Sequence, residues 1–160
     1  MQMEEDKLFL DEDHETCAPP ADSVWADLEQ ADRLARAVNF FVMGQLRVAQ
    51  QSSPEMADSR SAKLTMFAFG VAEEMMRLAG ISTPREQVAQ VVYLSLLVGG
   101  EQTDALKLTT DAQALRSNPD MNVFSLYGRT AVQMLVREEQ DTMQMFARVL
   151  GEKDDLRRAN

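Results

Sequence analysis

The sequence has few residues of the kinds that cross-link a chain or bind metals. It contains one His and one Cys in 160 residues. A single Cys cannot form an intrachain disulfide, and the common zinc, haem and iron–sulfur sites that need several His or Cys ligands cannot form within one chain. Gly and Pro are also scarce, at 7 and 5 residues. This composition excludes collagen-like and low-complexity chains and is typical of a folded protein.

Long hydrophobic runs are missing as well. The longest, Val88 to Val98, contains two polar residues, and a helix that crosses a bilayer needs about 20 apolar residues. The acidic segment from Met1 to Asp22 has only one contiguous apolar run, Leu8 to Leu10, whereas the core of a signal peptide needs about 7 to 15 residues. We therefore expect no membrane association. The single Cys17 favours a reducing compartment, the cytoplasm.

Negative charge is concentrated at the N-terminus. The formal net charge is −10, and Met1 to Asp22 holds eight acids against one base, Lys7. This segment thus carries −7, and its self-repulsion predicts a disordered acidic tail over residues 1–21. Binding to nucleic acid or to anionic lipid requires clustered Lys and Arg. We therefore expect neither a nucleic-acid nor a membrane partner.

Apolar residues recur at three- and four-residue steps along the rest of the chain, which predicts helices. Thr83 and Glu86 form a capping box at the start of one helix, and Gly151 is expected to end the last. Five helices are predicted, over residues 22–50, 54–79, 84–98, 103–116 and 120–150.

The expected fold class is all-α, a single-domain bundle of about five helices over residues 22–151. A frayed polar C-terminus is expected over residues 152–160. The helix at 84–98 is apolar nearly all round, which is typical of a central helix surrounded by others.

Sequence motifs for catalysis are scarce. A di-iron bundle needs two Glu-x-x-His pairs, and the chain has only His14. Gly-x-Ser-x-Gly and P-loop motifs do not occur. His14 and Cys17 lie three residues apart in the tail, where a chance pairing is the simpler interpretation than a catalytic dyad. We expect no catalytic residue, no metal and no cofactor.

Two carboxylates on the predicted helices are expected in different environments. Glu73 is placed on the outer side of its helix, where it can pair with Arg77. Glu138 falls on the inner arc of the last helix near Tyr127, where a buried, unpaired Glu would have a raised pKa. Alternatively, Glu138 lies where that helix extends beyond the helices packed against it, or it pairs with an Arg. A small-ligand-binding or catalytic bundle with a pocket near Glu138 and Tyr127 is therefore the alternative function.

Large apolar residues outside the main stripe give the preferred hypothesis. Three of them project from the charged side of the first helix, where they either meet another helix of the chain or form a patch that a partner covers. The tail adds an apolar triplet between two acidic triads, typical of a segment that orders on a basic, apolar groove, or else of a solubilising leader. We predict a non-enzymatic, cytoplasmic, homodimeric interaction module that acts as an adaptor, regulator or chaperone-like partner. The predicted contact residues are Trp25, Phe40, Met43, Leu8, Phe9 and Leu10.

Overall fold

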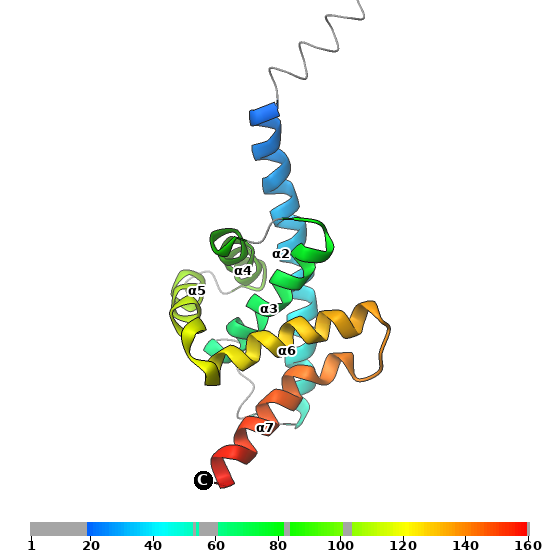
Figure 1. Cartoon of the computed structure of the whole chain (residues 1–160), viewed down its shortest axis with the longest axis vertical. Helices are drawn as coiled ribbons and strands as arrows, with labels where there is room; N and C mark the ends of the chain where they lie inside the picture. Colours follow the sequence, from blue (N-terminus) through cyan, green and yellow to red (C-terminus); the bar gives the residue numbers. More distant parts are fainter. Residues whose placement is uncertain (1–18, 53, 55–60, 82–83, 101–103, 160) are drawn as a thin grey trace, which may run out of the picture. The chain divides into compact units, whose positions relative to one another are not determined.

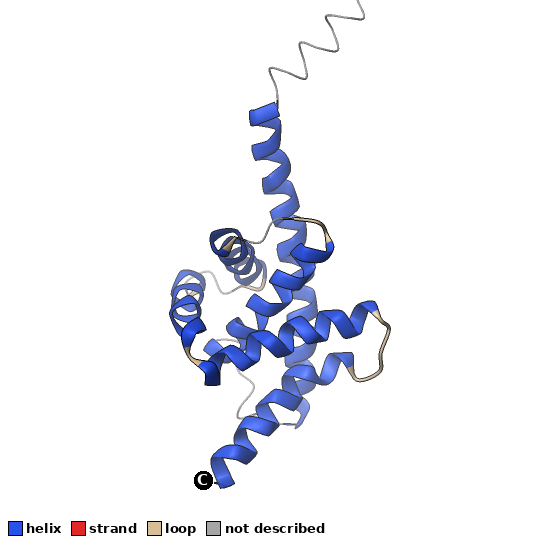
Figure 2. Cartoon of the chain, in the orientation of Figure 1, coloured by secondary structure: helices blue, strands red, loops and turns tan. Residues whose placement is uncertain are grey.

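The computed structural model describes residues 19–52, 54, 61–81, 84–100 and 104–159. Within these ranges every regular element is a helix (Figures 1 and 2), which confirms the predicted all-α bundle. The elements are α2 (Pro19–Ser52), α3 (Ala62–Leu78), α4 (Arg85–Val98), α5 (Ala105–Ala114), η1 (Leu115–Ser117), α6 (Pro119–Val136), η2 (Thr142–Gln144) and α7 (Met145–Ala159), where η marks a single turn of 3-10 helix.

The chain divides into two units, residues 1–31 and 32–160. The first unit contains the beginning of α2. The second contains the rest of α2 and all the other helices of the bundle.

The central helix of the bundle is α3. Every residue from Leu64 to Ala72 is buried, and α3 contacts α4, α5 and α6. The prediction that the helix at 84–98 is central was wrong, because α4 is buried along one side only. Val88 and Val92 are buried, whereas Glu86 and Gln90 are exposed. Apolar residues around a helix show that it can be covered, but they do not show how many neighbours it has.

The start of α3 differs from the prediction. The sequence indicates a start at Pro54, but the helix begins at Ala62 because the Ser61 hydroxyl caps it, accepting a hydrogen bond from the Leu64 amide at 3.1 Å. The predicted capping box of α4 includes Thr83, which lies outside the described residues.

The predicted continuous helix over 120–150 was also wrong. α6 ends at Val136, and Glu138 and Asp141 adopt positive φ angles of 56° and 66°. The chain reverses there, and α7 returns against α6 (Figure 1). α7 then runs through Gly151 to Ala159. Gly151 therefore does not stop the helix, and the segment expected to fray is helical.

A buried glutamine of α2 stabilises this reversal. Gln45 is 0% exposed. Its Nε2 donates to the Thr142 carbonyl oxygen at 2.6 Å, and its Oε1 accepts from the Phe146 amide at 3.0 Å. The first amides of a helix have no partner within it, so Gln45 supplies one for α7. The reversal between α6 and α7 thus depends on a side chain about 100 residues earlier in the sequence.

Two glycines allow α3 and α6 to cross closely. A Cβ atom on Gly70 would lie 1.8 Å from the Ser125 carbonyl oxygen, and one on Gly128 would lie 2.1 Å from the Phe67 carbonyl oxygen. Each glycine thus faces the backbone of the other helix. Even a methyl group at either position requires the two helices to move apart.

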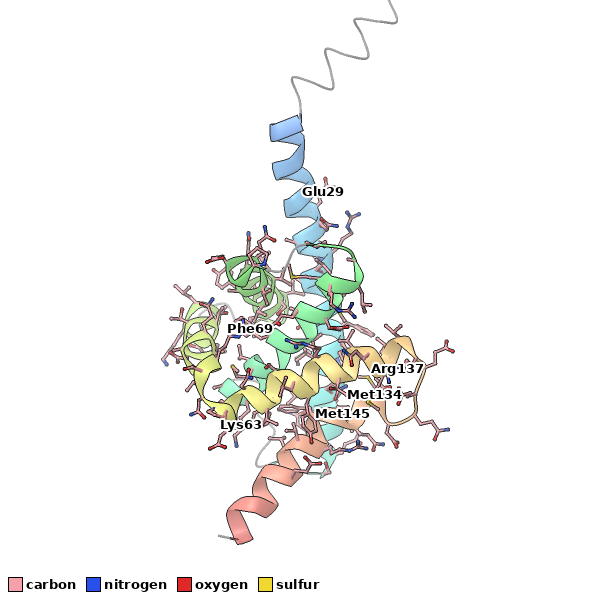
Figure 3. All side chains as sticks on the ribbon, viewed as in Figure 1. Glu29, Lys63, Phe69, Met134, Arg137 and Met145 are labelled. Atoms are coloured by element: carbon pink, nitrogen blue, oxygen red, sulfur yellow. The ribbon has the colours of Figure 1, made fainter. Side chains whose placement is uncertain are left out.

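A cluster of ion pairs connects α3 with η1 and α6. Glu73 of α3 pairs with Arg116 of η1 and, through its Oε2, with Nη2 of Arg129 of α6 at 2.5 Å. The Arg116 guanidinium lies 5.4 Å from the ring centroid of Phe69, which is fully buried. Phe69 belongs to α3 and is labelled in Figure 3. Glu73 therefore pairs across helices, and the predicted Glu73–Arg77 pair is not the one that forms.

Arg77 pairs instead with Glu74. Glu74 is 2% exposed, and its carboxylate accepts hydrogen bonds from Arg77 Nε at 3.1 Å. These bonds lower the pKa of Glu74 below its usual value near 4.5, although burial acts in the opposite direction. Glu74 is thus ionised at neutral pH.

Candidate functional site

The candidate site lies on the outward side of α2. From Ala35 to Ala49 the buried residues of α2 follow one stripe, which packs into the bundle. Phe40 lies on the opposite side and is 81% exposed. At 100° per residue, Arg33, Arg36 and Arg47 point within about 40° of Phe40. We call Arg33, Arg36, Phe40 and Arg47 the Phe40 face.

The Phe40 face is basic in an acidic protein. Residues 33–52 contain these three arginines and no Asp or Glu, whereas the whole chain has a net charge of −10. Arg36 Nε donates to Asp32 at 3.0 Å, and both side chains are more than half exposed, so this pair contributes little stability. Among the described residues, none forms an ion pair with Arg33 or Arg47. Two guanidinium groups on this face are thus available to an acidic partner.

A groove continues the Phe40 face toward the end of α2. Its α2 side extends from Val48 to Ser52, the turn that follows Arg47, and it lies between α2 and the segment formed by η2 and α7. Its volume is about 510 Å³, and an exposed arginine, Arg148, lines its α7 side. The other lining residues are Val48, Ser52, Gln144 and Ala147.

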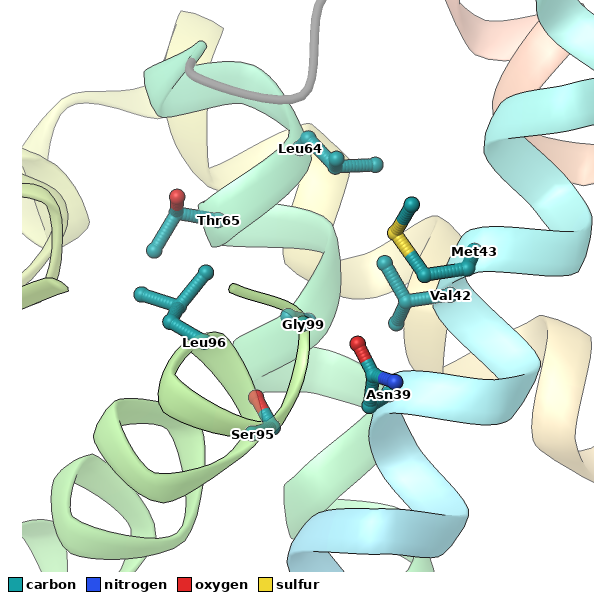
Figure 4. A pocket seen from close by; sticks show the side chains of 9 residues that line it. Asn39, Val42, Met43, Leu64, Thr65, Ser95, Leu96 and Gly99 are labelled. Atoms are coloured by element: carbon teal, nitrogen blue, oxygen red, sulfur yellow. The ribbon is translucent and has the colours of Figure 1, made fainter. Parts of the chain in front are cut away.

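Of the predicted contact residues on this helix, the structure describes the side chains of Phe40 and Met43, and of these two Phe40 lies on the exposed surface. Met43 is half-buried and lines a cavity between α2, α3 and α4 (Figure 4). The side chain of Trp25 lies outside the described residues, as do Leu8, Phe9 and Leu10. Sequence reasoning did not identify the arginines around Phe40 as part of a contact surface, although their spacing of four and seven residues was visible in the sequence.

The cavity beside Met43 is small. Its volume is about 30 Å³, which is room for one or two water molecules. Its two hydroxyl-bearing residues are already satisfied, because Thr65 Oγ1 donates to the Ser61 carbonyl oxygen and Ser95 Oγ donates to the Val92 carbonyl oxygen. The cavity does not offer space for a metabolite.

The predicted pocket near Glu138 and Tyr127 does not have the predicted geometry. Glu138 is exposed in the turn after α6, so the expectation of a buried acid was wrong. Tyr127 lies nine residues before Val136, the last residue of α6, which corresponds to about 14 Å of helix. Its hydroxyl donates to Glu152 of α7, and this hydrogen bond raises the pKa of Tyr127 above its usual value of 10.0.

The described part of the chain has neither a metal-binding cluster nor a membrane-spanning helix. No three His, Cys, Asp or Glu residues gather there in a way that could bind a metal ion. None of the described helices is both long and apolar enough to span a bilayer. No family model, no curated protein and no solved structure matches this chain.

Proposed function

We propose that this protein is a non-enzymatic interaction module of the cytoplasm, an adaptor or regulator, and that it binds its partner through the Phe40 face. The observation that carries the proposal is the 81% exposure of Phe40 among three arginines on one side of a helix. Burying a Phe side chain is worth about 1.5–3 kcal/mol. Phe40 therefore stabilises a complex if a partner covers it.

The residue types on this face support an interaction surface. Aromatic residues and Arg are enriched at the centres of protein interfaces. Arg is suited to this position because its planar guanidinium binds carboxylates with two hydrogen bonds and loses less hydration than Lys. The expected partner segment therefore combines an apolar residue for Phe40 with acids for Arg33, Arg36 and Arg47.

A peptide titration tests this proposal. The probe is a synthetic ten-residue peptide, unrelated to this chain, in which an apolar triplet lies between two triads of Asp and Glu. It is added to the ¹⁵N-labelled full-length protein while amide chemical shifts are followed by NMR. We expect shifts concentrated in residues 33–51 and weakened by salt, because exposed ion pairs are screened.

Two controls define the result. Phe40→Ser removes the binding, whereas Leu106→Ser, at a residue of α5 that is 69% exposed, preserves it. A peptide with Lys in place of every acid produces no shifts. Equal shifts with the acidic and the basic peptide, or unchanged binding by Phe40→Ser, would contradict the proposal.

A further inference from the structure

We infer that the Phe40 face binds the segment Glu4–Asp13 of a second copy of this chain, and that two such contacts join a homodimer. The inference rests on the proposed function, because it names the partner of the same surface. Three properties of the chain support it: complementary charge, matched spacing and a groove that extends the surface.

The charges of the segment and the face are opposite. The segment Glu4–Asp13 contains six acids, one base and an apolar triplet with Phe9 at its centre. Residues 33–52 contain three bases and no acid. Opposite charges arranged in this way both attract the segment and fix its register on the face.

The spacings also match. Along α2, Arg33 and Arg47 lie seven residues before and after Phe40, which is about 10.5 Å in each direction. An extended chain rises about 3.3 Å per residue and its side chains alternate in direction, so Glu5 and Asp13, four residues on either side of Phe9, would point to the same side as Phe9 at about 13 Å from it. When Phe9 contacts Phe40, the two acids reach the two arginines.

The groove gives the segment a place to continue. Beyond Arg47 it leads past Gln51 to Arg148 of α7. In the extended form, the residues that adjoin Glu5 or Asp13 would enter this groove, where Arg148 supplies a further positive charge. The surface complementary to the segment is therefore longer than the Phe40 face alone.

A second group of exposed apolar residues lacks this complementarity. Leu78, Leu135 and Val136 lie at the ends of α3 and α6 and are 47%, 46% and 59% exposed. The arginines beside them are already paired, Arg77 with Glu74 and Arg137 with Glu139. An acidic segment would have to compete with these carboxylates, so the Phe40 face is the site that we assign.

A second copy suits the contact because every copy carries both the segment and the face. Exchange between two copies makes the contact twice and closes the assembly with two-fold symmetry. The first contact raises the effective concentration of the second segment, so two weak contacts give a stable dimer.

A charge exchange tests the inference in the full-length protein. The tail-reversed variant carries Glu5→Lys and Asp13→Lys, and the face-reversed variant carries Arg33→Glu and Arg47→Glu. Masses are measured by sedimentation velocity over a range of protein and salt concentrations. We expect the wild type to form a dimer of twice 18.0 kDa. Each variant alone should dimerise at least about tenfold more weakly, because like charges then meet.

Mixing the two variants is the decisive measurement. In the mixture, one contact joins a wild-type segment to a wild-type face, and the other joins a Lys-bearing segment to a Glu-bearing face. Dimerisation should therefore return. The matched control for the face, Lys107→Glu with Arg137→Glu, makes the same change in net charge at exposed residues elsewhere and should dimerise like the wild type.

The outcomes separate this inference from the proposed function. A wild type that remains monomeric, a tail-reversed variant that dimerises normally, or a mixture without recovery would overturn the inference. If the unrelated acidic peptide still binds at Phe40 in those cases, the interaction surface stands and only the identity of its occupant is wrong.

Discussion

The α3–α6 crossing and the Phe40 face contain the same combination of residue types. At the crossing, Arg116 lies over the ring of Phe69, Arg129 is nearby, and Glu73 pairs with both arginines. On the Phe40 face, the aromatic ring and the arginines are present, but residues 33–52 supply no acid. Phe69 is fully buried, whereas Phe40 is 81% exposed.

The difference shows what neutralises the arginines and covers the ring in a cluster of this composition. Glu73 neutralises two guanidinium groups at once, and the close approach of α3 and α6 covers the ring that they border. On the Phe40 face Arg36 is paired with the exposed Asp32, but among the described residues Arg33 and Arg47 lack a carboxylate and the ring lacks a covering element. An acidic segment with an apolar centre would provide both, and this is the composition of Glu4–Asp13.

The largest effect is expected at the crossing itself. Gly128→Ala places a methyl group against the Phe67 carbonyl oxygen and should destabilise the protein by about 3 kcal/mol or more, at the upper end for overpacked sites. Urea denaturation measures the loss. Gly151→Ala is the matched control, because nothing lies within 4 Å of its Cβ position. It should instead stabilise α7 by about 0.5–1 kcal/mol. A Gly128→Ala variant as stable as the wild type would show that the crossing is loosely packed.

The next largest loss of stability is expected at Gln45, on the buried side of α2. Gln45→Leu leaves the Thr142 carbonyl and the Phe146 amide without their partner and should cost about 1–3 kcal/mol. Hydrogen exchange should then accelerate in η2 and in the first turn of α7 more than in α3. The exposed neighbour Gln51 serves as the control, and Gln51→Leu should leave the exchange of η2 unchanged. Uniform acceleration throughout the bundle would contradict a local role for Gln45.

A smaller effect is expected from pH. The pKa of Glu74 is lowered in the folded protein, so its contribution is present above its unfolded pKa, near 4.5, and is lost as pH falls through the lower folded value. Glu74→Gln should therefore flatten the decline in unfolding free energy between about pH 5 and 3. Arg77→Gln should flatten it too, because it removes the main cause of the shift. Parallel curves for Glu74→Gln and the wild type would exclude this linkage.

The smallest effect on stability is expected at the Phe40 face. Phe40→Ser removes no buried contact and should change the unfolding free energy by less than about 0.5 kcal/mol. Phe40→Ser should weaken association instead, whereas Gly128→Ala should mainly lower the stability of the fold. Thermal unfolding measured at a concentration where the wild type is monomeric checks this. A large destabilisation would mean that Phe40 belongs to the packed bundle.

Local patterns were sufficient to predict the helical class and most helix positions. The three- and four-residue spacing of α2 separated Phe40 from the buried stripe, and the helix start predicted at residue 120 lies one residue from the observed start of α6 at Pro119. The same approach failed at Glu138, because the helical angle places a residue correctly only while the helix continues. The residues near Val136 do not indicate the reversal of the chain, because the side chain that stabilises the reversal is Gln45 of α2.

The sequence by itself determined that the chain forms amphipathic helices, that negative charge is concentrated in its N-terminal segment, and that Phe40 lies outside the apolar stripe. These are properties of neighbouring residues, and helix periodicity makes them visible. Only the tertiary structure decided that α3 is central, that Gly70 and Gly128 meet a facing backbone, and that Glu73 pairs with Arg116 and Arg129. Those outcomes depend on distances between helices, which the spacing of residues along one helix does not contain.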